Sequence, residues 1–297
     1  MTDDPFMDPA RNGYAGERTD VRRTKDGRPY IWSFEKEKET PYTRVTSFID
    51  VLDDKTMLAR WGERMALLGI RDSVELGREL MALLPCDPED EAALDAEKKA
   101  LNDLVSRAKE FAGSRKAAQY GTDLHGLTEM ADRAEVLPDL DAKVQADLDA
   151  YLVALERHRI VPVEIEVFVA NDELKAAGTF DRTMDWYRDG WDEPPMRVIG
   201  DLKTGRVDYG QGKLAMQLAL YANSKRYDPE KPQERESLGV STTTGLVIHL
   251  PAGKAECKVY ETDLTLGWEG LQLAKQVREW RRRTARGVLG DLDLQVT

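Results

Sequence analysis

The feature that most constrains the fold is a change of residue pattern near position 160. Before it, apolar residues recur at helical spacing, and after it three β-rich segments follow one another at 162–171, 176–187 and 196–204. Short polar or Gly/Pro-rich turns separate these segments, and such turns favour hairpins between antiparallel strands. The sequence therefore predicts a β-meander that follows a helical region.

The segments around the meander predict further elements. We expect helices at 46–69, with a break at Asp53 and Asp54, and at 88–113, 114–133, 140–159, 210–226 and 266–287. We expect two more strands at 243–251 and 255–263. This order predicts an α/β protein with a mixed central β-sheet flanked by helices and an N-terminal helical region. Three parts are expected: a flexible lead-in over 1–39, a helical region over 40–160 and a sheet domain over 161–297.

A lysine and two carboxylates interrupt strands that are otherwise apolar. In the third strand, Ile199, Asp201 and Lys203 alternate onto one face. An aspartate and a lysine side by side can hold a hard cation together with a water or phosphate, or they can form an ordinary exposed ion pair. The Asp-x-Lys pattern alone favours the ion pair.

Asp181 in the second strand strengthens the case for a cation site. Regular alternation places it on one face with Thr179 and Thr183. If the second and third strands are antiparallel neighbours, Asp181 and Asp201 lie close together, because neighbouring strands are about 4.8 Å apart. Two carboxylates at that distance can share one metal ion. The alternative is an ordinary carboxylate at a turn or strand edge.

Four other side chains have both a functional and a structural interpretation. His125 lies in a helical segment, on one face with Glu129, and a neutral imidazole can bind Mn²⁺ or Mg²⁺. Glu166 is a carboxylate inside an apolar strand; Glu164 shares its face and is a rival, and that face looks either onto a polar site or onto solvent. Gln217 and Tyr221 share a helix face at i and i+4. Taken alone, His125 favours a structural role, and an ordinary surface position is the alternative for the Gln–Tyr pair.

Together, these residues form an ordered set of motifs: GTDLH (121–125), Glu166, GTFD (178–181), GDLKTG (200–205) and QLALYA (217–222). The set resembles the RecB-like branch of the PD-(D/E)XK nuclease superfamily, which includes the CRISPR-associated RecB-like exonucleases. The similarity covers about residues 40–285 and extends to iron-free versions encoded by actinobacterial phages. It implies a restriction-endonuclease-like core, with the nuclease core at 161–297.

The resemblance also implies roles for the matching residues. The metal ligands of the family correspond to His125, Asp181, Asp201 and the Leu202 carbonyl. Its catalytic residues correspond to Asp181, Asp201, Lys203, Gln217, Tyr221 and, at a less regular position, Glu166. Some relatives hold an iron–sulfur cluster on four cysteines, but this chain has only two, Cys86 and Cys257, so no such cluster is expected.

The activity implied by the resemblance is that of a DNA hydrolase. We expect a deoxyribonuclease that depends on Mg²⁺ or Mn²⁺, with exonuclease action on linear ends favoured, in phage DNA recombination, repair or degradation. Its partners would be DNA and a recombination protein. The alternatives are a catalytically weak DNA-binding or recombinase-partner module and a structure-specific endonuclease.

Charge and hydropathy restrict where DNA could bind and where the protein acts. The formal net charge of −12 argues against adhesion to nucleic acid over the whole surface, so any DNA-binding surface must be local. Basic residues cluster at 107–116 and 276–286, and each cluster is equally compatible with a solvated helix face. No apolar run is long enough to span a bilayer, and the polar N-terminus lacks the apolar core of a secretory signal. The expected location is cytoplasmic, and is the host bacterial cytoplasm if a phage encodes the chain.

Overall fold

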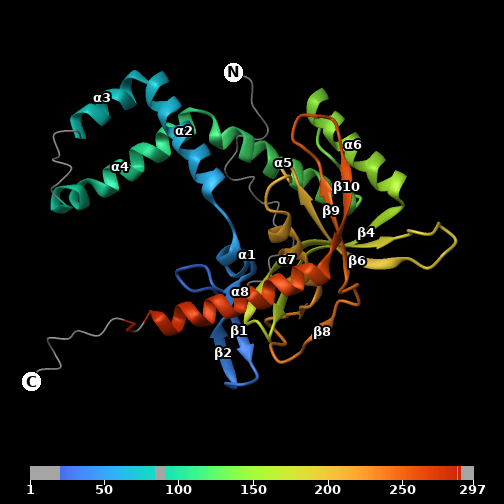
Figure 1. Cartoon of the computed structure of the whole chain (residues 1–297). Coiled ribbons are helices and arrows are strands. Elements are labelled where there is room, and N and C mark those ends of the chain that lie inside the picture. The colour runs from blue at the N-terminus through green and yellow to red at the C-terminus, as the bar shows by residue number, and fades with distance from the viewer. Residues whose placement is uncertain (1–20, 84–90, 286, 289–297) are drawn as a thin grey trace, which may run out of the picture. The chain divides into compact units, whose positions relative to one another are not determined.

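The computed structural model describes residues 21–83, 91–285 and 287–288 (Figure 1). The chain forms two compact units, one of residues Asp54–Leu124 and one that combines Met1–Asp53 with His125–Thr297. These bounds differ from the expected divisions at 40 and 160, because the chain up to Asp53 and the part of the helix from His125 onwards both belong to the unit with the sheet.

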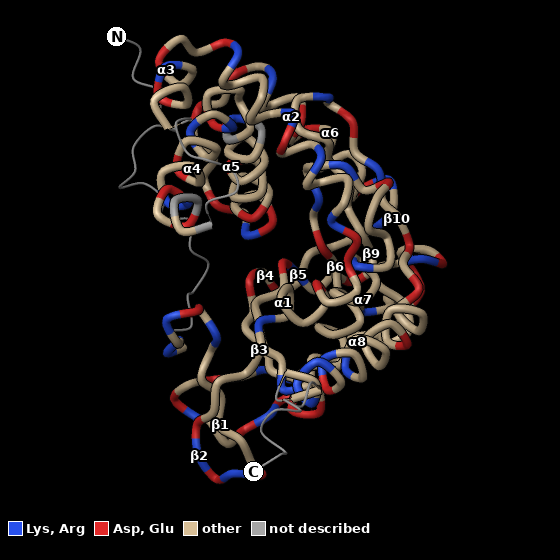
Figure 2. The backbone as a smooth tube through the Cα atoms, turned by 60° about the vertical axis from the view of Figure 1, so that its left-hand side comes forward, with Lys and Arg blue, Asp and Glu red and all other residues tan. Residues whose placement is uncertain are grey.

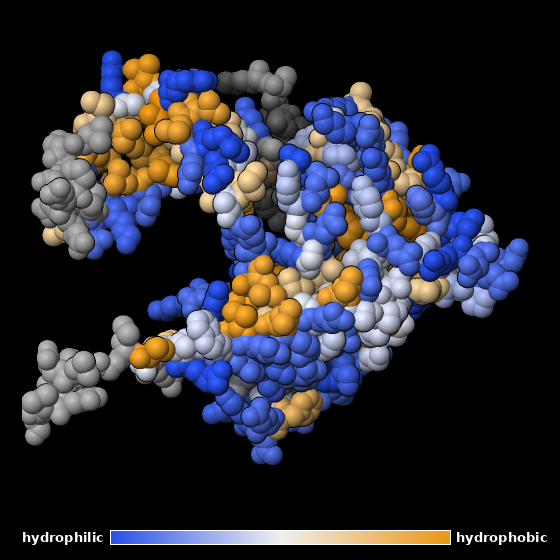
Figure 3. All heavy atoms as spheres, in the orientation of Figure 1, coloured by the Kyte–Doolittle hydropathy of each residue, from blue (hydrophilic) through white to orange (hydrophobic). Residues whose placement is uncertain are grey.

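The helical unit consists of α2 (Thr56–Asp72), α3 (Val74–Leu83), α4 (Glu91–Phe111) and the first part of α5 (Ser114–Asp132). Gly69 lets α2 approach α4, because a Cβ there would lie 1.9 Å from the Ala108 carbonyl oxygen. Large apolar side chains remain exposed on this unit, among them Leu67 and Met81, and its apolar residues appear as orange spheres at the upper left of Figure 3.

The expected helix break is confirmed. The short α1 (Val45–Ile49) and a 3₁₀ turn (Asp50–Leu52) precede α2, whose first residue, Thr56, donates its backbone N–H to Asp54 at 2.9 Å. Asp54 therefore marks the start of the second helix, since Asp side chains bond to nearby backbone N–H groups.

The sheet has eight strands and is mixed. Along the sheet the strands follow the order β10-β9-β6-β5-β4-β7-β8, and β3 pairs with β5. The strands are β3 (Thr43–Arg44), β4 (Ile160–Asn171), β5 (Ala176–Trp186), β6 (Met196–Lys203), β7 (Lys225–Arg226), β8 (Glu236–Ser237), β9 (Thr244–His249) and β10 (Lys258–Asp263). Both predicted hairpins, β4–β5 and β5–β6, are antiparallel, whereas β6 and β9 are parallel. The predicted fold class is confirmed.

Helices cover both faces of this sheet. On one face, α7 (Gln211–Ala222) and α8 (Leu264–Thr284) share a core with Ile199 of β6 and Val247 of β9. Against the other face lie α6 (Ala142–His158) and the second part of α5 (Figure 1). There the side chain of Arg182 contacts Asp132 and Tyr151. Among the described helices, none is long and apolar enough to cross a membrane.

A hairpin of β1 (Tyr30–Ser33) and β2 (Lys38–Pro41) precedes the sheet. Ile31 and Tyr42 pack in a small core with Phe168 and Tyr227, so residues 21–39 are ordered, contrary to the expectation of a flexible lead-in. Residues 1–20 of that expected segment lie outside the described residues.

One edge of β5 has two different partners, and the space between them positions the site described next. β3 pairs with β5 at Ala176 and Ala177, whereas β6 pairs with it from Arg182 to Trp186. In the described chain, residues 178–181 therefore have no strand partner on this edge. We call this interruption the sheet gap.

Candidate functional site

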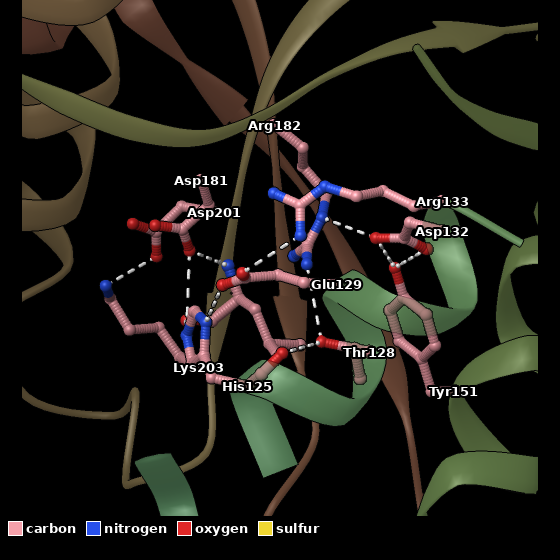
Figure 4. A network of polar contacts seen from close by, with 11 residues as sticks. His125, Thr128, Glu129, Asp132, Arg133, Tyr151, Asp181, Arg182, Asp201 and Lys203 are labelled. Atoms are coloured by element: carbon pink, nitrogen blue, oxygen red, sulfur yellow. Dashed lines mark hydrogen bonds and ion pairs between the residues drawn. The ribbon is translucent and has the colours of Figure 1, made fainter. Parts of the chain in front are cut away.

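Three polar groups converge at the sheet gap. The carboxylate of Asp181 on β5 accepts the backbone N–H of Leu202 at 2.9 Å. Nε2 of His125, on α5, lies 2.9 Å from the Leu202 carbonyl oxygen and 3.6 Å from Oδ2 of Asp181 (Figure 4). A backbone N–H that would bond to a neighbouring strand thus bonds to a side chain instead, which fixes Asp181 beside the end of β6.

Asp201 adds a buried carboxylate next to this group. Its side chain is 3% exposed, with Oδ1 accepting a hydrogen bond from Nε2 of Gln217 at 3.0 Å. Oδ2 lies 2.5 Å from Nζ of Lys203, with which it forms an ion pair. Burial first, and then the charge of Asp181, raise the pKa of Asp201 to about 6, although Lys203 opposes the shift.

Glu166 lies opposite Asp181 in the hairpin. The pairs Ile165–Arg182 and Val167–Phe180 enclose it, so the register places the two acids side by side. Burial first, and then the charges of Glu129 and Asp181, raise the pKa of Glu166 to about 7. Its φ of +57° lies in the left-handed region, which costs free energy for a residue other than glycine.

The alternation of side chains in β5 breaks at Asp181. Phe180 packs in the core under α7, and so does Ile199, the partner of Thr183. Thr179 instead pairs with Phe168, which belongs to the core under the N-terminal hairpin. The prediction that Thr179 and Thr183 share a face is therefore wrong, because a local irregularity at Asp181 and Glu166 interrupts the regular alternation.

Glu129 supports His125 from the same helix. Its Oε1 lies 3.7 Å from Nδ1 of His125, at the i,i+4 spacing that the sequence contains. Burial lowers the pKa of His125, but Glu129, Asp181 and the Leu202 carbonyl raise it, and the net shift is upward. A carboxylate on Nδ1 orients the ring so that Nε2 points into the site.

Arg182 is a charged group that the motifs do not reveal. Its side chain is fully buried, and Nε donates to Oδ2 of Asp132 at 3.0 Å. The Tyr151 hydroxyl donates to the same carboxylate at 2.7 Å (Figure 4). The positive charge of Arg182 lowers the pKa of Glu166 and so partly offsets the crowding of carboxylates. Apart from its place directly after Asp181 in the sequence, nothing indicates this role.

Gln217 and Tyr221 hold the site from α7. Gln217 orients Asp201 through the hydrogen bond described above. Tyr221 is 4% exposed and packs edge-on against Phe180, with ring centroids 6.2 Å apart. A Cβ at Gly178 would lie 3.3 Å from its hydroxyl oxygen. Tyr221 is too buried to contact a DNA backbone, whereas Gln217 is partly buried.

The donor set fits a divalent cation that prefers oxygen ligands. An imidazole nitrogen, carboxylates and a backbone carbonyl suit Mg²⁺ or Mn²⁺. Two ligands at right angles on an ion with bonds of about 2.1 Å are about 3 Å apart, and Nε2 of His125 lies 2.9 and 3.6 Å from its two oxygen neighbours. Oδ2 of Asp201 is buried beside this group and forms an ion pair with Lys203, so a cation bound there would share this oxygen with the lysine.

The expected metal ligands do not form a cluster of side chains alone. Within the described residues, no three His, Cys, Asp or Glu side chains form a ready cluster for a metal ion. One expected ligand is a backbone group, the Leu202 carbonyl, and Asp201 forms an ion pair with Lys203. Neither the protein-family models nor the curated proteins contain a match to this chain.

Proposed function

We propose that the protein is a metal-dependent deoxyribonuclease of the RecB-like PD-(D/E)XK type, with exonuclease action favoured. The observation that carries the proposal is the meeting of His125, Asp181 and the Leu202 carbonyl at the sheet gap, beside the Asp201–Lys203 pair. The resemblance of the motifs adds a role in recombination, repair or degradation of phage DNA in the host cytoplasm.

The electrostatics of the site support a cation. Asp201 and Glu166 have pKa values raised to about 6 and about 7, so the folded chain resists ionising both carboxylates beside Asp181. A divalent cation would offset this repulsion. When bound, it would also neutralise charge on the phosphate and make a water molecule more acidic.

The chain's own residues would divide the remaining work. Lys203 is anchored by buried Asp201, yet its side chain is 32% exposed, so its ammonium group can contact a phosphate oxygen or orient the attacking water. Glu129 would hold the His125 ring through Nδ1, and Gln217 would hold the Asp201 carboxylate through Oδ1. Hydrolysis would then break the bond between phosphorus and the leaving sugar oxygen, with water supplying the new P–O bond.

The proposal is tested by incubating the protein with linear and closed circular DNA in Mg²⁺, Mn²⁺ or EDTA. We expect metal-dependent loss of linear DNA, and losses of at least about 100-fold in rate for Asp201→Asn and Lys203→Ala. Asp192→Asn, in the exposed turn between β5 and β6, is the matched control and should cut normally.

Each other outcome has a defined meaning. If the folded wild type cuts neither substrate with any metal, or if Asp201→Asn cuts as fast as the wild type, the proposal is wrong. Metal-independent DNA binding without cutting would indicate a binding module. Cleavage of closed circles would indicate an endonuclease. End-labelled linear DNA then gives the polarity of digestion.

A further inference from the structure

A cluster of arginines joins the N-terminal hairpin region to α8. We call it the arginine patch; it consists of Arg28, Arg44, Arg281 and Arg282, with Arg278 at its base. The four outer side chains are exposed, whereas Arg278 is half-buried. Figure 2 draws the basic stretch of α8 in blue, near β3. The segments that contribute lie far apart in the sequence, so only the fold brings them together.

Arg278 anchors the patch rather than serving as a free charge. Its guanidinium lies 4.8 Å from the centroid of the Phe48 ring. Nη2 donates to Oγ1 of Thr43 at 2.8 Å, and Nη1 donates to the Ser47 carbonyl at 3.3 Å. These contacts tie α8 to the segment that includes β3 and α1. The other arginines are therefore held on a packed surface.

The remaining arginines gather around the same segment. Nη2 of Arg28 donates to the Pro41 carbonyl at 2.8 Å, two residues before Thr43. Arg44 follows Thr43 directly, and its Nη1 would lie 3.5 Å from a Cβ at Gly27. Arg281 and Arg282 are three and four residues after Arg278, on the same side of the helix. Arg283 falls on the opposite side, where it lines a shallow hollow with Trp280.

The charges of the patch are not neutralised within the described chain. None of its five guanidinium groups forms an ion pair with a described carboxylate. Burial lowers the pKa of Arg278, and the charges of Arg282, Arg28 and Arg281 lower it further. By contrast, Arg107 in the other basic segment is paired with Glu79 and Asp103. Mutual repulsion in a protein of net charge −12 points to an external polyanion.

We propose that the arginine patch binds the phosphate backbone of DNA beside the cleavage site. The choice of DNA as the polyanion rests on the proposed function. Exposed guanidinium groups on a rigid surface can contact successive phosphates and release counterions, which provides affinity without sequence preference. The proposed DNA-binding surface contains part of the basic 276–286 cluster, together with Arg28 and Arg44. Arg283 is not part of this surface.

The distance from patch to site suits a continuous strand of DNA. Arg44 pairs with Ala177 in β5, and Asp181 is four residues farther along that strand. At about 3.3 Å per residue the separation is about 13 Å. Stacked nucleotides advance by about 3.4 Å each, so about four nucleotides would connect Arg44 to the sheet gap.

The test measures binding of a fluorescein-labelled DNA duplex in EDTA, so that cleavage does not interfere, between about 50 and 200 mM salt. The test variant is Arg281→Gln with Arg282→Gln, and Arg283→Gln is the control on the opposite side of the same helix. Glutamine and arginine have similar helix propensities, so the fold should persist. Circular dichroism and thermal melting check this.

We expect the double variant to bind about 10- to 100-fold more weakly at the lower salt concentration, with a slope of log affinity against log salt that is shallower by roughly 1–2. Arg283→Gln should match the wild type. Arg44→Gln should give a smaller loss and a slope shallower by about 0.9. An unchanged slope in the double variant, or an equal loss in Arg283→Gln, would overturn the assignment.

Two further comparisons complete the test. One distinguishes DNA from a membrane surface as the partner of the patch, and the other distinguishes failure of the patch assignment from failure of the proposed nuclease activity. In the first comparison, vesicles of phosphatidylcholine and phosphatidylserine compete with the labelled DNA, and unlabelled DNA is the reference competitor. If the vesicles displace the labelled DNA at a lower phosphate concentration than unlabelled DNA does, the partner is a membrane surface and the inference fails. The second comparison measures cutting of the same DNA in Mg²⁺ by the wild type and by the double variant. If the double variant binds DNA more weakly but the wild type cuts nothing, the proposed function fails while the patch assignment stands. If the double variant binds and cuts DNA as the wild type does, only the patch assignment fails.

Discussion

The replacement Glu166→Gln tests whether the carboxylates at the sheet gap repel one another in the metal-free protein. Glu166 has a pKa raised to about 7 by burial and then by Glu129 and Asp181. Glutamine has nearly the same shape, so it removes the charge while preserving the packing and the positive φ of +57°. A change in stability then measures the electrostatic cost alone.

The magnitude follows from the displaced pKa. A rise from the ordinary value of about 4.3 to about 7 corresponds to about 3.7 kcal/mol at full burial. Because Glu166 is partly exposed, solvent screening reduces this to about 1–2 kcal/mol. The folded pKa lies above the unfolded one, so ionisation opposes folding. The cost is complete above about pH 7 and disappears as the pH falls towards about 4.3.

Thermal unfolding in EDTA at pH 8, 6.5 and 4.5, three values that bracket the shift of about 4.3 to 7, measures the effect. We expect Glu166→Gln to raise the melting temperature at the highest pH by about 2–6 °C and to have little effect at the lowest. Glu164→Gln is the control from the same strand, because Glu164 is paired with Arg226 at 2.6 Å. Its replacement should not stabilise the protein at any pH.

Two results would refute this reasoning. A variant that is no more stable than the wild type at the highest pH would mean that the neighbouring carboxylates do not repel the ionised Glu166. A gain of equal size at both ends of the pH range would mean that the cause is packing or hydrogen bonding, since charge cannot contribute where the wild-type residue is already protonated.

Three further predictions concern other parts of the structure. Asp132→Asn should lower the free energy of unfolding by about 3 kcal/mol in denaturant titrations, because it removes the carboxylate that pairs with buried Arg182; an effect below about 1 kcal/mol would contradict a tight pair. Gly69→Ala should cost about 1–3 kcal/mol in the same assay, because its methyl group would overlap the Ala108 carbonyl, and an unchanged stability would show that α2 and α4 do not pack this closely. Saturating Mn²⁺ should stabilise the wild type by about 2.7 kcal/mol at 100 times the dissociation constant, and Asp181→Asn should lose most of this gain; calorimetric binding of Mn²⁺ by that variant with wild-type affinity would place the ion elsewhere.

Local patterns predict much of the fold. The strands β4, β5 and β6 lie within two residues of the segments expected from alternation and turns, and both hairpins form as expected. The two-residue strands β3, β7 and β8 have no recognisable pattern, because their pairing depends on tertiary contacts. The sheet gap was therefore not predictable, since it exists only where β3 replaces β6.

The candidate site divides in the same way. The closeness of Asp201 and Lys203 follows from strand alternation, and the approach of Asp181 to β6 follows from the hairpin. The contact of His125 with Leu202 spans 77 positions in the sequence, and only the resemblance of the motifs suggested it. The role of Arg182 was not predictable, because a charged residue in a strand ordinarily indicates a solvent-facing position, whereas this one is fully buried.

The buried pair of Arg182 and Asp132 has a consequence for any mutational scan of this protein. Arg182 is chain neighbour to Asp181, so the same short stretch of β5 must satisfy both the interior of the fold and the proposed chemistry. A screen that scores only lost activity would identify Asp132 and Tyr151 together with the carboxylates at the gap, although these two residues contact Arg182. Measuring the amount of folded protein for each variant would sort the two groups, and would show which losses arise during folding and which arise in the finished molecule.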